Sequence, residues 1–340
     1  MDTLSVAPMA PPRRDLRLGF ILLGMVLLCL VLAVRFGSAG MVNLLTEFLY
    51  FLALAQLWNL LAGFAGVVSL GQHAYIGLGG YVLFICVMWF QMSPWLGIAL
   101  AAAAGCLASF AIAFLVFRLK GPHLAIGTWV IAEVFRLGFS QIGDLGGNAG
   151  TSLPPAVVQA LDMQSVSRDG LLYLVALALC TGIHAAAFLL LASRHGLALT
   201  AIRDNEAAAR SSGVPSARVK WLVYVLVALA TAAIGALIYL AKFRITPASA
   251  FDINWTSYAI FIVVIGGVGT LEGPIIGTII FFLLREYLAD LGTWYLIVLG
   301  GIAVAVMLKL PMGLWGALAA RFDLHLFPLR RRLPAGRRTP

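Results

Sequence analysis

Charged residues are scarce in this sequence. Lys, Arg, Asp and Glu make up 11% of its 340 residues, whereas 62% are apolar and the mean hydropathy is +0.99. A typical soluble domain is about 25% charged, so the composition excludes one and predicts an integral membrane protein. A helix needs roughly 20 apolar residues to cross the bilayer, and the length therefore allows about ten spans. The longest polar interruptions, 141–169 and 194–220, are shorter than the roughly 50 residues of a small domain, so no separate soluble domain is expected.

Cysteines and catalytic motifs are also few. The four cysteines, Cys29, Cys86, Cys106 and Cys180, lie within apolar runs and lack the pairing and spacing of a zinc or disulfide framework, so no metal site is expected. The sequence has no G-x-x-x-x-G-K-[ST] phosphate loop, no H-E-x-x-H pair and no G-x-S-x-G or C-x-x-C motif. The chain is therefore not expected to hydrolyse ATP through a phosphate loop, and a membrane-embedded enzyme has no visible catalytic constellation.

The apolar runs predict an all-α polytopic membrane protein. The predicted spans lie near residues 18–34, 42–62, 73–91, 95–117, 122–140, 170–192, 219–241, 256–271, 274–289 and 293–310. The first run is too long for the core of a signal peptide and is interpreted as a retained helix. If the N-terminus is cytoplasmic and the spans alternate, 17 of the 23 basic residues lie on the cytoplasmic side. This agrees with the positive-inside rule and predicts that both termini are cytoplasmic.

The connections divide the chain into a transmembrane region and two tails. We predict a cytoplasmic N-terminal tail at 1–17, a transmembrane domain at 18–316 and a basic cytoplasmic tail at 317–340. Within the transmembrane region, 141–169 is predicted to be a structured external loop and 194–218 a cytoplasmic loop. The formal net charge of +9 arises mainly from basic residues at the ends of apolar runs. This placement indicates orientation in the membrane and gives no reason to expect a nucleic-acid partner.

The polar stretch 196–220 favours a helix although it lies between two apolar spans. Its alanines have high helix propensity, and Glu206 with Arg210 forms an i, i+4 pair. Gly213 is expected to end this helix and Ser216 to cap the next one. The pattern predicts one short, rigid helix presented to the cytoplasm.

Such a helix is suited to dock on a partner. The short side chains of Ala207 and Ala208 allow this face of the helix to enter a groove on a partner. Arg203, Asp204 and Glu206 supply charges that orient the partner. The alternative interpretation is an ordinary solvated connector, which rarely combines helix propensity, a glycine stop and a cap.

Polar side chains within spans are costly and usually face a partner or a water-filled route. The candidates for a translocation path are Glu47, Gln56, Asn59, Gln72, His73, Glu133 and Arg136. Glu133 and Arg136 are three residues apart, which favours a mutually neutralised pair over two substrate ligands. Gln56 and Asn59 follow Glu47 on the same span, although the spacing does not guarantee a common face. His184 is interpreted as a hydrogen-bonded core histidine.

Two glycine-rich stretches allow more than one structure. Glycines between Gly63 and Gly80, around Gln72 and His73, indicate either a broken helix that lines a cavity or tight helix packing. Gly269, Gly273 and Gly277 recur every four residues. They share one helix face if a helix continues through Pro274, but Gly266 and Gly267 can equally make a turn with Pro274, either a hairpin or a re-entrant turn.

The run AIRDNEAAARSSGV at 201–214 resembles the EAA loop of ABC importer permeases, specifically the version in LivM-type permease subunits of branched-chain amino acid importers. Four further stretches agree in the same order: LAGFAGVVSLGQHAYIGLGGY at 61–81, RLKGPHLAIGTWVIAEVFRL at 118–137, VIGGVGTLEGPIIG at 264–277 and LKLPMGLWG at 308–316. The resemblance covers residues 40 to 316. A departure is LGGNAG at 145–150, where the family more often has a threonine and a proline.

The resemblance implies a permease subunit in the bacterial inner membrane that imports leucine, isoleucine and valine. It implies no cofactor on this chain, since ATP and Mg are used by the partner ATPase. The ATPase-coupling residues would be Arg203, Asp204, Glu206, Ala207, Ala208 and Gly213. The implied partners are a paralogous permease, two ABC ATPase subunits and a periplasmic solute-binding protein.

Relatives of similar pattern serve urea, short amides or other amino acids, so the substrate stays open. A self-sufficient secondary carrier or channel is the alternative from another class, motivated by Glu47, Glu133 and His184.

Overall fold

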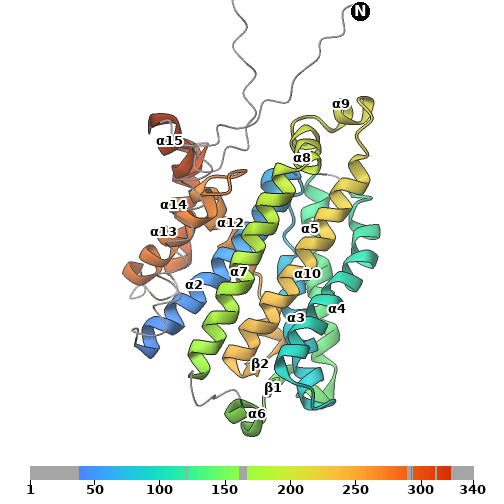
Figure 1. Ribbon diagram of the computed structural model, residues 1–340, viewed down its shortest axis with the longest axis vertical. Helices are drawn as coiled ribbons and strands as arrows, with labels where there is room; N and C mark the ends of the chain where they lie inside the picture. Colours follow the sequence, from blue (N-terminus) through green and yellow to red (C-terminus); the bar gives the residue numbers. More distant parts are fainter. Residues whose placement is uncertain are drawn as a thin grey trace, which may run out of the picture.

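The computed structural model describes residues 38–119, 121–160, 167–288, 292, 294–310 and 312–322, and this part of the chain is mainly helical (Figure 1). The α-helices are α2 (Ala39–Asn59), α3 (Gln72–Met88), α4 (Pro94–Val116), α5 (Pro122–Ser140), α6 (Pro155–Ala160), α7 (Arg168–Ala192), α8 (Arg194–Asp204), α9 (Glu206–Ser211), α10 (Ser216–Lys242), α11 (Pro247–Ala250), α12 (Asn254–Gly266), α13 (Gly273–Leu288), α14 (Trp294–Lys309) and α15 (Gly313–Phe322). The short elements are the π-helical segment η1 (Leu60–Phe64), the 3-10 turns η2 (Gly143–Leu145) and η3 (Gly147–Ala149), and the strands β1 (Thr151–Ser152) and β2 (Arg244–Ile245).

The predicted spans coincide with helices wherever the structure describes them. Each predicted range from 42–62 to 293–310 overlaps one long helix, with η1 continuing α2. The first predicted span, 18–34, and the N-terminal tail lie outside the described residues, and α15 continues past the predicted start of the C-terminal tail. Six helical segments of the described chain are long and apolar enough to cross a membrane: Ala39–Phe64, Pro94–Val116, Arg168–Ala192, Ser216–Lys242, Pro247–Gly266 and Trp294–Phe322. The count of ten spans and the cytoplasmic termini stay predictions.

Helix α10 lies at the centre of the bundle and packs against α3 and α4 (Figure 1). A Cβ atom at Gly235 of α10 would overlap the backbone of Ile76 in α3, and one at Gly79 of α3 would overlap the backbone of Ala232 in α10. Membrane helices associate largely through such small residues, because lipid tails are as apolar as leucine. This reciprocal contact therefore sets how closely α3 and α10 approach.

The outer helices expose apolar side chains. Leu107 and Phe114 on α4, Val134 on α5, Leu189 on α7 and Leu308 on α14 are all more than half exposed. Apart from the Glu133–Arg136 pair on α5, the exposed sides of these helices are largely apolar, as expected of membrane spans, and they lack the broad polar face that would mark the outside of a soluble helix. Their exposed surfaces are suited to contact lipid.

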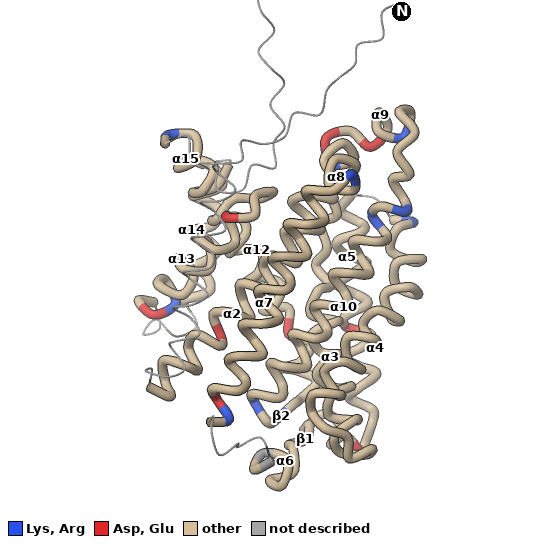
Figure 2. The backbone as a smooth tube through the Cα atoms, viewed as in Figure 1, with Lys and Arg blue, Asp and Glu red and all other residues tan. Residues whose placement is uncertain are grey.

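The two ends of the bundle carry different structures (Figure 1). Helices α8 and α9 lie at one end, and the β1–β2 pair with α6 lies at the other. Thr151 pairs with Ile245 and Ser152 with Arg244 in an antiparallel register, so the described part of the predicted external loop is structured and anchored to the chain that follows α10. Figure 2 shows that most charged residues lie toward these two ends of the long helices.

Candidate functional site

The polar loop between α7 and α10, residues 194–218, is called here the coupling segment, and it contains two helices. Helix α8 ends at Asp204, and Asn205 adopts an extended conformation with φ −158°. The Asn205 side chain then caps α9, because its Oδ1 accepts a hydrogen bond from Ala208 N at 3.0 Å. The prediction of one helix was therefore wrong, since Asn205 both interrupts the first helix and starts the second.

Helix α9 ends at the glycine that the sequence analysis predicted, but the residue that caps the next helix differs from the predicted one. Gly213 has φ +83°, its N–H donates to Arg210 O at 2.9 Å, and Val214 N donates to Ala209 O at 3.0 Å. This is the Schellman arrangement, which confirms Gly213 as the helix stop. The prediction that Ser216 caps α10 was wrong. Pro215 occupies the cap position without a side-chain hydrogen bond, and Ser216 is already helical.

Glu206 fastens α9 to α10. Its Oε1 accepts a hydrogen bond from Arg210 at 2.6 Å, which confirms the predicted pair, and its Oε2 accepts one from Lys220 of α10 at 2.7 Å. The Lys220 ammonium, followed by the Arg210 guanidinium, lowers the pKa of the Glu206 carboxyl. Because the folded state favours the ionised carboxylate, its stabilising contribution is complete above the ordinary pKa of 4.5 and is lost as the pH falls through the lowered value.

A hydrogen-exchange experiment can test this contribution. In Glu206→Gln at pH 7, the amides of 206–211 should exchange about two- to fivefold faster than in the unmodified protein, as expected for a partly exposed ion pair. After correction for intrinsic rates, this difference should shrink as the pH is lowered below 4.5. A difference that persists in acid would show that the carboxylate charge is not what holds α9.

Arg203 points toward the membrane helices. Its Nη1 donates to the carbonyl of Gly63 in η1 at 3.1 Å, and its Nε donates to Asp204 Oδ1 at 3.0 Å. Ala207 and Ala208 are exposed. The coupling segment therefore presents a low alanine surface outward while Arg203 connects it to the end of α2.

Next to Arg203, the helix is interrupted between α2 and α3. A broken helix was part of one of the two interpretations of this glycine-rich stretch. The α-helix changes to π-helical winding at Leu60–Phe64, and α3 begins only at Gln72. Asn59 lies just before the break and is fully buried. Its Oδ1 accepts a hydrogen bond from Gly269 N at 2.8 Å, and its Nδ2 donates to Thr270 O at 2.7 Å. The side chain of Asn59 thus holds the turn between α12 and α13, and its place in a translocation path stays a prediction.

These contacts form one connected group. Gly63 lies so close to Gly269 that a Cβ atom on Gly63 would come within 2.6 Å of Gly269 N. A Cβ atom on Gly269 would in turn meet Arg203 Nη1 at 3.0 Å. We call Arg203, Gly63, Asn59, Gly269 and Thr270 the latch. It joins the coupling segment to α2 and to the α12–α13 turn.

Both structures considered for the 269–277 glycines are present in part. The chain leaves α12 after Gly266 and enters α13 at Gly273, and Gly269 between them has φ +74°. The continuous helix face is therefore wrong, and α12 and α13 form a helical hairpin. Gly273 and Gly277 nevertheless allow close packing on α12, since a Cβ atom on Gly277 would overlap the carbonyl of Ile262. Pro274 lies in the first turn of α13, where its missing N–H costs nothing.

The other predicted path residues do not converge on one cavity. Gln72 Nε2 donates to Leu54 O and Thr231 Oγ1, both at 3.3 Å, and His73 Nδ1 lies 2.9 Å from Thr256 Oγ1. Gln56 is fully buried with no hydrogen-bond partner for its amide within the described residues. The broken helix is thus packed among other helices.

Two further polar predictions concern hydrogen bonding within single helices. Glu133 and Arg136 form a bidentate pair with Arg136 Nε 2.9 Å from both carboxylate oxygens, which confirms mutual neutralisation. His184 Nδ1 bonds to the carbonyl of Cys180 at 2.9 Å, so it is a hydrogen-bonded histidine as predicted.

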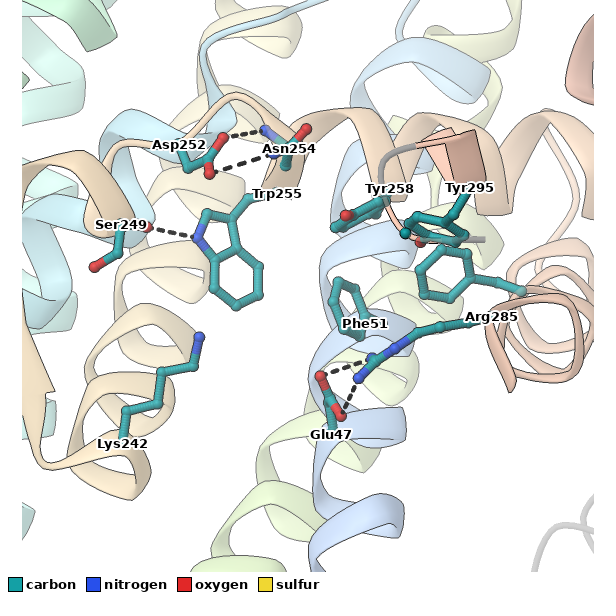
Figure 3. A pocket seen from close by; sticks show the side chains of 12 residues that line it. Glu47, Phe51, Lys242, Ser249, Asp252, Asn254, Trp255, Tyr258, Arg285 and Tyr295 are labelled. Carbon is teal, nitrogen blue, oxygen red and sulfur yellow. Dashed lines mark hydrogen bonds and ion pairs between the residues drawn. The ribbon is translucent and has the colours of Figure 1, made fainter. Parts of the chain in front are cut away.

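A cavity of about 450 Å³ lies near the β2 end of the bundle and was not predicted (Figure 3). We call it the Lys242 cavity. It is lined by Glu47, Phe51, Lys242, Ser249, Asp252, Asn254, Trp255, Tyr258, Phe281, Arg285, Gly292 and Tyr295. Glu47 pairs there with Arg285, with N–O distances of 2.8 and 3.1 Å. Only Glu47 had been considered for a path, and its partner is 238 residues away, so no local pattern could reveal the pair.

The apolar spans and internal polar contacts define a multi-pass α-helical membrane protein. A family model described as branched-chain amino acid transport system, permease component, matches residues 40–307. The chain belongs to this family of transport permeases.

Two curated relatives extend this result. The chain is 27% identical to the high-affinity branched-chain amino acid transport system permease protein LivM of Escherichia coli, over 84% of this chain and 73% of the relative. It is 26% identical to the protein of the same name from Salmonella typhimurium, over 82% of this chain and 70% of the relative. No solved structure matches the chain.

Proposed function

We propose that this chain is the permease subunit of an ATP-driven ABC importer for branched-chain amino acids in a bacterial inner membrane. It does not catalyse a reaction itself; a separate ATPase subunit binds ATP and Mg and docks on the coupling segment. The observation that carries this proposal is the coupling segment, because two capped helices expose Ala207 and Ala208 to a partner while Arg203 reaches the membrane helices. The names of the LivM relatives support the substrate.

We propose that the complete importer contains a paralogous permease, two ABC ATPase subunits and a periplasmic solute-binding protein. Transport proceeds by alternating access. ATP binding moves the docked coupling segment, and the latch passes this displacement to α2 and to the α12–α13 hairpin through the contacts of Arg203 and Asn59. A rigid contact of this kind shifts the population between two membrane conformations.

Uptake by reconstituted complexes tests the proposal. The full complex in proteoliposomes should take up leucine only when ATP is supplied, and replacing Gly213 with valine should reduce uptake at least tenfold. Gly213 has φ +83°, a conformation that a β-branched residue adopts only with strain, so the end of α9 would be displaced. Glu206→Gln should give a smaller loss, because its ion pairs are partly exposed.

The outcomes separate the alternatives. Both variants should insert normally, as judged by yield and size-exclusion chromatography. Unchanged ATP-driven uptake together with normal ATPase co-purification in both variants would contradict the role of the coupling segment. Uptake driven by an ion gradient without ATPase would indicate a secondary carrier. A preference for urea or a short amide would contradict branched-chain amino acids as the substrate.

A further inference from the structure

Among the described residues, four charged side chains of both signs line the Lys242 cavity. Glu47 and Arg285 neutralise each other, and Lys242 and Asp252 supply the second cation and anion. The cavity therefore offers balanced charge, and its volume of about 450 Å³ falls in the range of small-molecule sites.

Lys242 and Asp252 are the two charges available to a ligand. Within the described part of the chain, Lys242 forms no ion pair; its ammonium lies 4.7 Å from the ring centre of Trp255. Asp252 accepts hydrogen bonds from the backbone and side-chain nitrogens of Asn254, at 2.9 and 3.3 Å, but it has no cationic partner among the described residues. Placement at the last turn of α10 favours a cation at Lys242, and placement just before α12 favours an anion at Asp252. Neither position supplies an oppositely charged partner among the described residues.

Trp255 separates these two charges and is held in place. Its indole N–H donates to Ser249 O at 3.0 Å, and its ring stacks on Phe51 with a centroid distance of 5.7 Å. In Figure 3, the Lys242 ammonium and the Asp252 carboxylate lie on either side of the indole. A ligand that contacts both must therefore carry a negative and a positive group and reach past the edge of the indole.

The adjoining wall of the cavity is aromatic. Phe51 lies 5.7 Å from Tyr258 and 5.3 Å from Phe281, and Tyr258 lies 5.2 Å from Phe281, measured between ring centroids. Such rings bury aliphatic groups favourably. The cavity thus combines separated charges with an apolar surface beside them.

We propose that the Lys242 cavity is a binding site for a zwitterionic α-amino acid with an aliphatic side chain. The carboxylate of the ligand pairs with Lys242, its ammonium pairs with Asp252, and its side chain contacts Trp255, Tyr258 and Tyr295, the partly exposed rings of the lining, which the buried Phe51 and Phe281 support from behind. This inference rests on the proposed function and specifies where the substrate binds on this chain. It also separates amino acids from urea and short amides, which have no charge to neutralise Lys242 or Asp252.

Three ligands that differ in charge test the assignment. Binding of L-leucine, leucinamide and 4-methylpentanoate to the intact complex in lipid nanodiscs, without the solute-binding protein, can be measured by saturation-transfer NMR. Leucinamide keeps the ammonium only, and 4-methylpentanoate keeps the carboxylate only. Lys242→Met should weaken the binding of leucine and 4-methylpentanoate about tenfold and leave the affinity for leucinamide unchanged. Asp252→Asn should weaken the binding of leucine and leucinamide and leave the affinity for 4-methylpentanoate unchanged. The amide oxygen that Asp252→Asn leaves at this position can still accept from Asn254, so the start of α12 should be preserved.

Matched controls lie outside the cavity. Arg244→Met and Asp144→Asn make corresponding charge changes at exposed positions and should leave all three affinities unchanged. The assignment of the site would be wrong if Lys242→Met weakened the binding of all three ligands equally or if neither cavity variant changed binding. Displacement of leucine by urea would also contradict it.

ATP-driven leucine uptake by the same complex distinguishes the two proposals. If uptake occurs but both cavity variants bind like the unmodified protein, only the site is wrong. If charge-matched binding occurs without ATP-driven uptake, the site stands and the proposed function is wrong.

Discussion

Replacing Arg203 with methionine should reduce ATP-driven leucine uptake at least tenfold while the ATPase subunits remain bound. The guanidinium donates to the Gly63 carbonyl at 3.1 Å and is the polar contact between α8 and the broken end of α2. A hydrogen bond to a charged group contributes about 1.5–3 kcal/mol, or roughly a 10- to 100-fold change in an equilibrium between conformations. Methionine keeps the apolar stem but donates no hydrogen bond. The ATPase activity of the complex should persist, so the amount of leucine transported per ATP should fall.

Arg321→Met is the matched control, because Arg321 is an exposed cation in the last turn of α15, outside both the coupling segment and the latch. It should leave uptake and ATPase activity unchanged. Loss of the ATPase subunits from Arg203→Met would show instead that Arg203 contacts the partner, as the sequence had suggested. Normal uptake with normal ATPase activity would exclude the latch as the route of coupling.

Replacing Gly235 with valine should prevent α3 and α10 from packing and largely abolish folded protein. A Cβ atom at this position would lie 2.6 Å from the Cα atom of Ile76, and a backbone atom cannot rotate away as a side chain can. Overpacking of an interior typically costs about 1–3 kcal/mol and sometimes more. We expect the upper end here, because the whole helix must move. The yield of monodisperse protein and its thermal unfolding in detergent measure the effect.

Gly182→Val provides the comparison within the same protein. Gly182 lies in the long helix α7, and nothing approaches within 4 Å of a Cβ atom built there. Valine has the same helix propensity cost in both variants, so their difference isolates the close contact between α3 and α10. Equal yields and equal unfolding temperatures for the two variants would show that the contact is not needed for assembly.

The sequence predicted the helices and the local signals well, because these depend on residues close together in the chain. Long apolar runs located the helices, and Gly213 ended α9 where its backbone conformation requires glycine. The two errors in the coupling segment are also local. Asn205 favours a cap over a helix interior and caps α9 here, and Pro215 takes the cap position that Ser216 was expected to fill.

The functional contacts were less predictable, because they join residues far apart in sequence. Asn59 reaches the backbone of Gly269 and Thr270 more than 200 residues away, so this contact was not predicted. Neither Lys242 nor Asp252 was predicted to belong to a site. Apolar helices have no polar face that would indicate their neighbours, and the sequence therefore could not place these residues around one cavity.

The balance of charge in the Lys242 cavity bears on how the membrane voltage acts on transport. Moving one elementary charge through a potential of 100 mV involves about 2.3 kcal/mol. Two cations and two anions line the cavity among the residues that the structure describes, and a bound zwitterion adds no net charge. Filled and empty states of the site thus experience nearly the same electrical force. Transport through such a site neither draws on the membrane voltage nor works against it, which agrees with the proposal that ATP hydrolysis in a partner subunit supplies the energy.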